Sequence, residues 1–82
     1  MSKVHDLKIY PGYFSDVLCG IKNFEVRYND RNFKVGDFVR LREFLMPDIY
    51  TGSFVMREIV YILDDPRYCL GGYVVLGLRE IT

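Results

Sequence analysis

Residues 11–28 read PGYFSDVLCGIKNFEVRY, and the spacing of the apolar side chains changes once within this stretch. Pro11 is suited to the first turn of a helix. Four apolar residues follow at the i, i+3, i+4 and i+7 positions of one helical face: Phe14, Val17, Leu18 and Ile21. The glycine of Gly20-Ile21 is typical of a helix end. The pattern predicts one short helix early in the chain.

The apolar spacing becomes two from Phe24 onward, which predicts a strand. Phe24, Val26 and Tyr28 share one face of this strand and are expected to enter the core. Glu25 and Arg27 share the opposite face, where their side chains lie about 6.6 Å apart. They are therefore positioned to contact one ligand together.

Four further stretches have the composition or alternation of strands: residues 4–10, 38–45, 54–63 and 73–81. Val35-Gly36-Asp37 predicts a tight turn, and residues 46–53 are expected to form the longest loop. Five strands and one early helix, in a chain too small for a two-layer sandwich, predict an α+β, mostly β fold. We expect a curled or closed five-stranded β-barrel with the helix capping one end.

Alternation within two of these stretches predicts which side chains enter the core. In residues 4–10 the expected core face is His5, Leu7 and Ile9, with Asp6 and Lys8 opposite. In residues 38–45 one face holds Val39, Leu41 and Leu45, and the other holds Phe38, Arg40, Arg42 and Phe44.

Chain length and charge limit the possible functions. The 82 residues allow one domain, spanning residues 1–82. Eleven Lys and Arg balance eleven Asp and Glu, which argues against a strong, sequence-blind DNA binder. The first 42 residues nevertheless carry eight basic and five acidic side chains, so a local basic face is possible.

Features of secreted, membrane or cofactor-dependent proteins are missing from the sequence. The N-terminus reaches charged residues before any apolar stretch, and no apolar run approaches the ~20 residues of a membrane span. Cys19 and Cys69 form neither a metal-ligand cluster nor a redox pair. With no P-loop, HExxH or Rossmann glycine pattern, we expect a cytoplasmic protein that has no membrane association, bound metal or cofactor.

Lys22, Glu25 and Arg27 form the main candidate site. They combine a carboxylate that accepts hydrogen bonds from a base or amide with two cations that can contact a phosphate or a carboxylate. The alternative is a structural role, in which Lys22 interacts with the helix C-terminus and the other two pair across the sheet.

Arg40 and Arg42 alternate with aromatic residues in a way that is used to stack bases and contact phosphates. Together with Tyr50, from the expected loop, they are predicted to line the approach to the ligand. The alternative is that the aromatics pack and the arginines form exposed ion pairs.

The residues Gly20, Lys22, Glu25 and Arg27 match the signature GxKxxExR, and the chain thereby resembles the ASCH superfamily. Further blocks, among them Tyr50-Thr51-Gly52, resemble a small bacterial and phage-associated ASCH-like family. The resemblance implies a PUA-like β-barrel with a cleft beside the helix, lined by the motif. It also implies recognition of RNA or of a modified nucleotide.

Some compact ASCH relatives are amidohydrolases of acetylated cytidine that use the motif lysine, a threonine and a separate glutamate. Lys22 matches the lysine, whereas Glu25 occupies the threonine position, and no helical pattern between Tyr50 and Tyr73 supplies the glutamate. This departure argues against amidohydrolase activity.

Three functions therefore remain open. The first is a module that binds RNA or a nucleotide-like small molecule, without catalytic residues. The second is an amidohydrolase of an acylated nucleoside, with Lys22 as nucleophile or base and Glu25 orienting water or substrate. The third is a protein-interaction module that uses the loop 47–53 and exposed aromatic residues.

Overall fold

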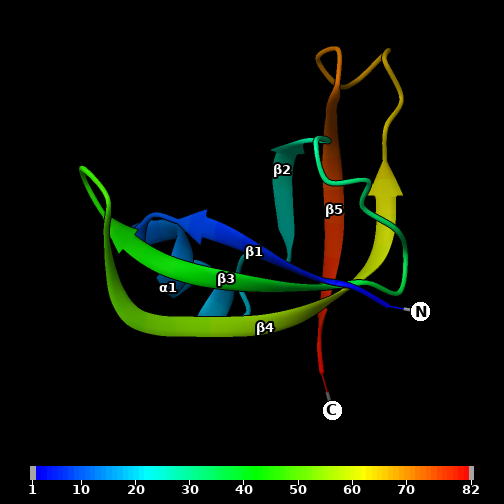
Figure 1. The fold of residues 1–82 in the computed structure, drawn as a ribbon. Helices are drawn as coiled ribbons and strands as arrows, with labels where there is room; N and C mark the ends of the chain where they lie inside the picture. Colours follow the sequence, from blue (N-terminus) through cyan, green and yellow to red (C-terminus); the bar gives the residue numbers. More distant parts are fainter. Residues whose placement is uncertain (1, 82) are drawn as a thin grey trace.

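The computed structural model describes residues 2–81, which form one helix and five strands (Figure 1). In chain order these are β1 (Val4–Ile9), α1 (Pro11–Leu18), β2 (Phe24–Tyr28), β3 (Phe38–Leu45), β4 (Ile49–Leu63) and β5 (Tyr73–Glu80). The fold is mostly β with one short helix near the N-terminus, as the sequence predicts.

The five strands form a single sheet in the order β1-β3-β4-β5-β2. β1 and β3 are parallel, and the other neighbours are antiparallel. β4 pairs first with β3 and then with β5, and it bends strongly between these two parts (Figure 1). Within residues 2–81 no ladder joins the edge strands β1 and β2, so the sheet is curled into a half-barrel.

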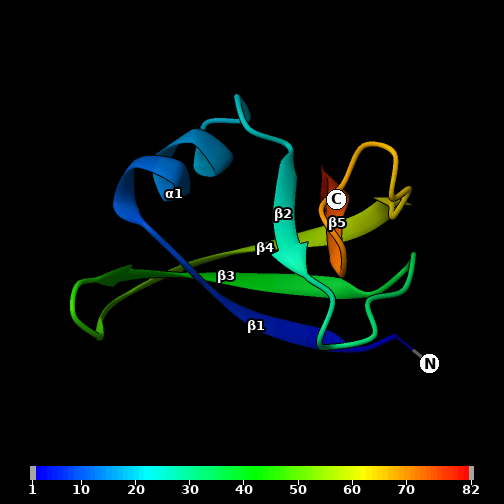
Figure 2. The same cartoon turned by 90° about the horizontal axis from the view of Figure 1, so that it is seen from above.

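The helix α1 lies over the concave side of the sheet, next to β3 and β4 (Figure 2). Phe14 and Val17 are buried, as predicted. The predicted helical stripe extends too far, however, because the helix ends at Leu18 and the side chains of Leu18 and Ile21 are exposed. Gly20, which adopts φ 81°, lies in the connection between α1 and β2.

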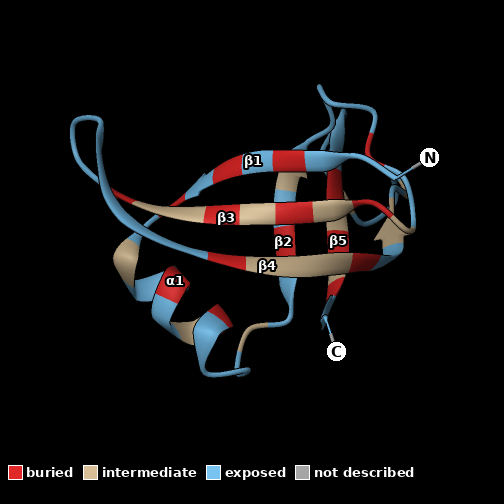
Figure 3. Ribbon diagram, turned by 60° about the horizontal axis from the view of Figure 1, so that its bottom comes forward, coloured by how far each residue is buried: buried red, intermediate tan, exposed pale blue. Residues whose placement is uncertain are grey.

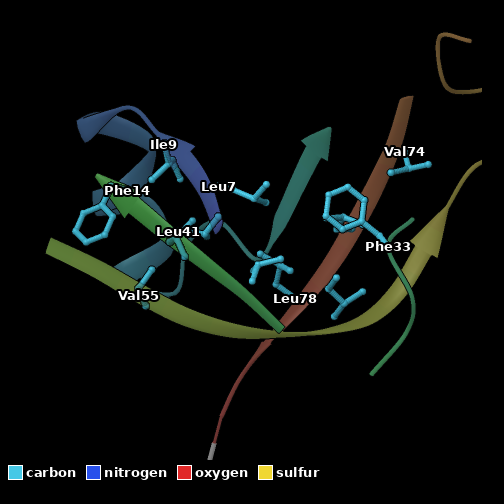
Figure 4. Close-up of a cluster of buried hydrophobic side chains, with 12 residues drawn as sticks. Leu7, Ile9, Phe14, Phe33, Leu41, Val55, Val74 and Leu78 are labelled. Carbon is cyan, nitrogen blue, oxygen red and sulfur yellow. The ribbon is translucent and has the colours of Figure 1, made fainter. Parts of the chain in front are cut away.

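Buried residues are found in all five strands and in α1, and the helix covers one part of this core (Figure 3). Figure 4 shows a cluster of its buried hydrophobic side chains, among them Phe14 from the helix and Leu41 from β3. The predicted core face of β1 is confirmed, since His5, Leu7 and Ile9 are all buried. Phe33, from the segment between β2 and β3, is also buried, and its ring lies 4.8 Å from that of His5.

The faces of β2 are the reverse of those predicted. Glu25 is buried, at 5% exposure, whereas Phe24, Val26 and Tyr28 lie on the exposed face. Alternation separates the two faces of a strand but does not show which of them is covered. Here the charged face is covered because the carboxylate of Glu25 has two cationic partners, which offset the cost of burial.

The faces on which the last residues of β3 lie, and the point at which β4 begins, also differ from the prediction. The pairing of β3 with β4 shifts its register between Arg42 and Phe44. As a result the side chain of Phe44 is buried and that of Leu45 is exposed. Such a bulge cannot be read from alternation alone. Residues 49–53 belong to β4 and not to a loop, so the β3–β4 connection is limited to residues 46–48.

Candidate functional site

The three motif side chains lie together on the concave side of β2. One carboxylate oxygen of Glu25, Oε1, accepts a hydrogen bond from Nζ of Lys22. The other, Oε2, accepts from Nε of Arg27 at 3.0 Å. Nζ of Lys22 also donates to the carbonyl oxygen of Phe24 at 2.6 Å. The buried negative charge is therefore held between two positive charges.

Arg27 also connects the two edges of the half-barrel. Its Nη2 donates to the backbone carbonyl oxygen of Lys8, on β1. In the same way, Nη1 of Arg31 donates to the carbonyl oxygen of Asp6 at 2.6 Å. Two arginine side chains thus satisfy carbonyl groups of β1 that have no partner strand.

A cleft of about 330 Å³ opens between these edges, beside the start of α1. This volume is at the lower end of the range for ligand pockets. Its lining comes from four separate segments: Lys8, Ile9 and Tyr10; Tyr13; Glu25, Val26 and Arg27; and Phe44. The rings of Tyr10 and Phe44 stack with their centroids 4.9 Å apart. The cleft therefore combines aromatic surface, a carboxylate and two cations.

The motif residues do not all face this cleft. Glu25 and Arg27 line it, whereas Lys22 lines a wider hollow of about 780 Å³ between the end of α1, the middle of β4 and the end of β5. That hollow also contains Arg57, whose Nη2 donates to the carbonyl oxygen of Val17 at 3.1 Å. Lys22 consequently contacts Glu25 from the side away from the cleft.

Arg40 lies apart from the cleft on the convex face of the sheet. Its Nε and Nη2 donate to the two carboxylate oxygens of Asp6 at 2.5 and 2.8 Å. The hydrogen bond from Arg40 lowers the pKa of Asp6 below its usual range. Arg40 therefore forms an exposed ion pair, which was the structural alternative for this residue.

Arg42 and Tyr50 lie closer to the rim of the cleft. The guanidinium of Arg42 is 4.0 Å from the centroid of the Tyr50 ring, within cation–π range. Nζ of Lys8, a cleft residue, lies 5.6 Å from the Phe44 ring and 6.0 Å from the Tyr50 ring. A hydrogen bond with Asp48 raises the pKa of Lys8. A line of alternating rings and cations thus leads from the cleft to Arg42.

Sequence reasoning did not identify Lys8, Tyr10 or Tyr13 as site residues, and it considered Phe44 only as one of the aromatic residues that alternate with Arg40 and Arg42. No local motif marks them, because they come together only when the ends of β1 and β3 meet the start of α1. Within residues 2–81, no three His, Cys, Asp or Glu side chains are grouped in a way that suits a metal ion. No helix in the same range is long and apolar enough to cross a membrane.

Comparison with known proteins gives two matches. Residues 4–78 match the family described as "Domain of unknown function (DUF3850)". The chain is also similar to the "Uncharacterized 12.9 kDa protein in GpA 3'region" of Escherichia phage P2, at 38% identity over 76 residues. This alignment covers 93% of the present chain and 68% of the phage protein. The chain therefore belongs to the DUF3850 family.

Proposed function

We propose that the protein binds a nucleotide, free or exposed in a short single-stranded RNA, in the cleft between β1 and β2. The observation that carries this proposal is the juxtaposition in one cleft of a buried carboxylate, stacked aromatic rings and cationic side chains. A nucleotide has a counterpart for each group: hydrogen-bond donors on the base, a flat ring and a phosphate.

Each group has a distinct role in this proposal. Glu25 accepts a hydrogen bond from an amino or imino group of the base, since each carboxylate oxygen has a lone pair left. Lys8 and Arg27 bind the phosphate through their positive charges and N–H groups. For Nη1 of Arg27 no partner is found within residues 2–81, so it is free to donate to a ligand.

The resemblance to the ASCH superfamily adds a second line of support. The half-barrel with its early helix is the architecture expected of an ASCH domain, and Gly20, Lys22, Glu25 and Arg27 match the ASCH signature. We therefore include in the proposal that this family is a branch of the ASCH superfamily, that the half-barrel is PUA-like and that the protein acts in the cytoplasm.

The overall charge favours a short ligand. A chain with no net charge lacks the field that attracts long polyanions. Arg42 and Tyr50, near the rim, extend the cleft by one further ring and cation, enough for a neighbouring nucleotide of an RNA strand. The contacts of Lys22 favour binding over catalysis, because its Nζ already donates to Glu25 and to the carbonyl oxygen of Phe24 and because Lys22 lines the wider hollow and not the cleft.

Calorimetric titration at low salt with the four ribonucleoside 5′-monophosphates and a short single-stranded RNA tests this function. Tyr13→Ala and Lys8→Ala each remove an exposed side chain from the cleft and are expected to weaken binding about tenfold. Tyr68→Ala and Lys34→Ala are the matched controls, because both residues are exposed and line none of the three pockets described. The proposal fails if no ligand binds, or if the two pairs of variants behave alike.

A further inference from the structure

The backbone of β2 presents a free edge to the cleft. Residues of an antiparallel strand point their N–H and C=O groups alternately toward and away from the neighbouring strand. Leu78 N donates to Asn23 O at 2.9 Å and Asn29 N donates to Gly72 O at 2.8 Å, which fixes this alternation. Glu25 and Arg27 therefore bond to β5, and the backbone groups of Phe24, Val26 and Tyr28 point outward.

Two of the three outward residues have their carbonyl groups occupied. Phe24 O accepts from Nζ of Lys22, and Tyr28 O accepts from the N–H of Asp30 at 2.9 Å. No partner within residues 2–81 is found for the N–H or the C=O of Val26. Val26 lines the cleft, and its outward amide donor and carbonyl acceptor lie on the edge of β2 that borders it.

The opposite wall of the cleft does not offer the same pair of groups. On β1 the bond from Phe38 N to Lys3 O, at 2.8 Å, shows that the carbonyl groups of Asp6 and Lys8 point away from β3. These are the two carbonyls that Arg31 and Arg27 already occupy. Val26 is therefore the residue of the cleft that has both an open backbone donor and an open backbone acceptor.

We propose that the backbone of Val26 reads the edge of the bound base, an inference that rests on the proposed function. The N–H donates to a ring nitrogen or carbonyl oxygen of the base, and the C=O accepts from the adjacent N–H or amino group. The hydrogen-bonding edges of nucleobases carry such neighbouring acceptors and donors, whereas a sugar phosphate has no equivalent edge. The ligand class is thus a heterocyclic base or its nucleotide, and not a sugar phosphate alone.

Amide hydrogen exchange on the unmodified protein tests the inference directly. An outward amide on an edge strand exchanges readily, and a hydrogen bond to a ligand slows its exchange. Saturating ribonucleoside 5′-monophosphate is expected to slow the exchange of the Val26 amide about tenfold or more. The Phe24 amide, outward on the same strand but outside the cleft, is the internal control and should not change. Ribose 5-phosphate should leave both amides unaffected.

A pair of variants at one position separates the backbone from the side chain. Val26→Pro removes the N–H, and proline is tolerated where an edge-strand N–H faces away from the sheet. This variant is expected to bind the nucleotides about tenfold more weakly, the effect of losing one hydrogen bond. Val26→Ala keeps the N–H, so it is expected to bind the nucleotides about tenfold more tightly than Val26→Pro does.

The outcomes separate the two proposals. If nucleotides bind but the Val26 amide stays unprotected, the inference is wrong and the proposed function stands. If no nucleotide binds to the unmodified protein, both fail. Should Val26→Pro not fold, the exchange measurement on the unmodified protein still decides.

Discussion

Arg27 donates from Nη2 to the backbone carbonyl oxygen of Lys8, and this contact fastens β2 to β1 where no ladder of backbone hydrogen bonds exists. The same side chain donates from Nε to Glu25. Arg27 thus contributes both to the closure of the half-barrel and to the orientation of the carboxylate in the cleft.

Replacement of Arg27 should therefore affect stability as well as binding. Arg27→Ala leaves the Glu25 carboxylate with one cation and the Lys8 carbonyl without a partner, and is expected to lower the free energy of unfolding by about 3 kcal/mol. Arg31→Ala, which removes an equivalent bond from an exposed position, should cost about 1 kcal/mol. Urea unfolding measures the free energy of unfolding of both variants. Equal losses would show that the contact between Arg27 and Glu25 adds nothing to stability.

The negative charge of Glu25 is expected to contribute to the stability of the protein, in addition to the size of its side chain. Glu25→Gln keeps the size of the side chain but leaves Lys22 and Arg27 close together without a counter-charge, at a cost of about 3 kcal/mol. In the double variant with Lys22→Met, the second substitution should recover part of this loss, because it removes one of the uncompensated cations. Additive losses in urea unfolding would argue against a shared network.

Local patterns predicted those parts of the fold that depend on neighbouring residues. The alternation of β1 shows its buried face, and Val35-Gly36-Asp37 forms the expected turn, with Gly36 at φ 96° and Asp37 N bonded to Lys34 O at 3.0 Å. A glycine at a positive φ in such a turn is a backbone requirement that the sequence displays directly.

The parts that were not predicted depend on contacts between distant segments. Whether Glu25 or Val26 lies on the concave side depends on the direction in which the whole five-stranded sheet curls, and the alternation within β2 does not encode this. The same holds for the site. The motif brings Lys22, Glu25 and Arg27 together as expected, but the cleft forms only where the segments around Lys8, Tyr13 and Phe44 meet.

Stability should fall in acid because of Asp37. Burial acts to raise the pKa of Asp37, but hydrogen bonds from His5, at 2.9 Å, and from the N–H groups of Lys3 and Lys34 outweigh it and lower the pKa. A carboxyl group whose pKa is lower in the folded state stabilises the protein above its unfolded pKa of about 4. This contribution is lost as the pH falls through the folded pKa.

The measurement is the free energy of unfolding from pH 7 to pH 2, for the unmodified protein and for Asp37→Asn. The variant should be less stable at pH 7, and the difference between the two curves should shrink below about pH 4. Asp6 and Asp65, whose pKa values are also lowered by hydrogen bonds from arginines, are present in both proteins and cancel in the difference. A difference that stays constant with pH would contradict the role of Asp37.

The paired glycines before β5 should differ sharply in their tolerance of alanine. Gly72 adopts φ 82°, a conformation that alanine rarely takes, and a Cβ atom there would meet the ring of Tyr28. Gly72→Ala is therefore expected to lower the free energy of unfolding by about 2 kcal/mol. Gly71 has an ordinary φ and nothing within 4 Å of an added Cβ, so Gly71→Ala should change stability by less than about 0.5 kcal/mol. Because the Tyr28 ring is exposed and able to move, a loss at Gly72 that persists in Tyr28→Ala would assign the cost to the backbone and not to the clash.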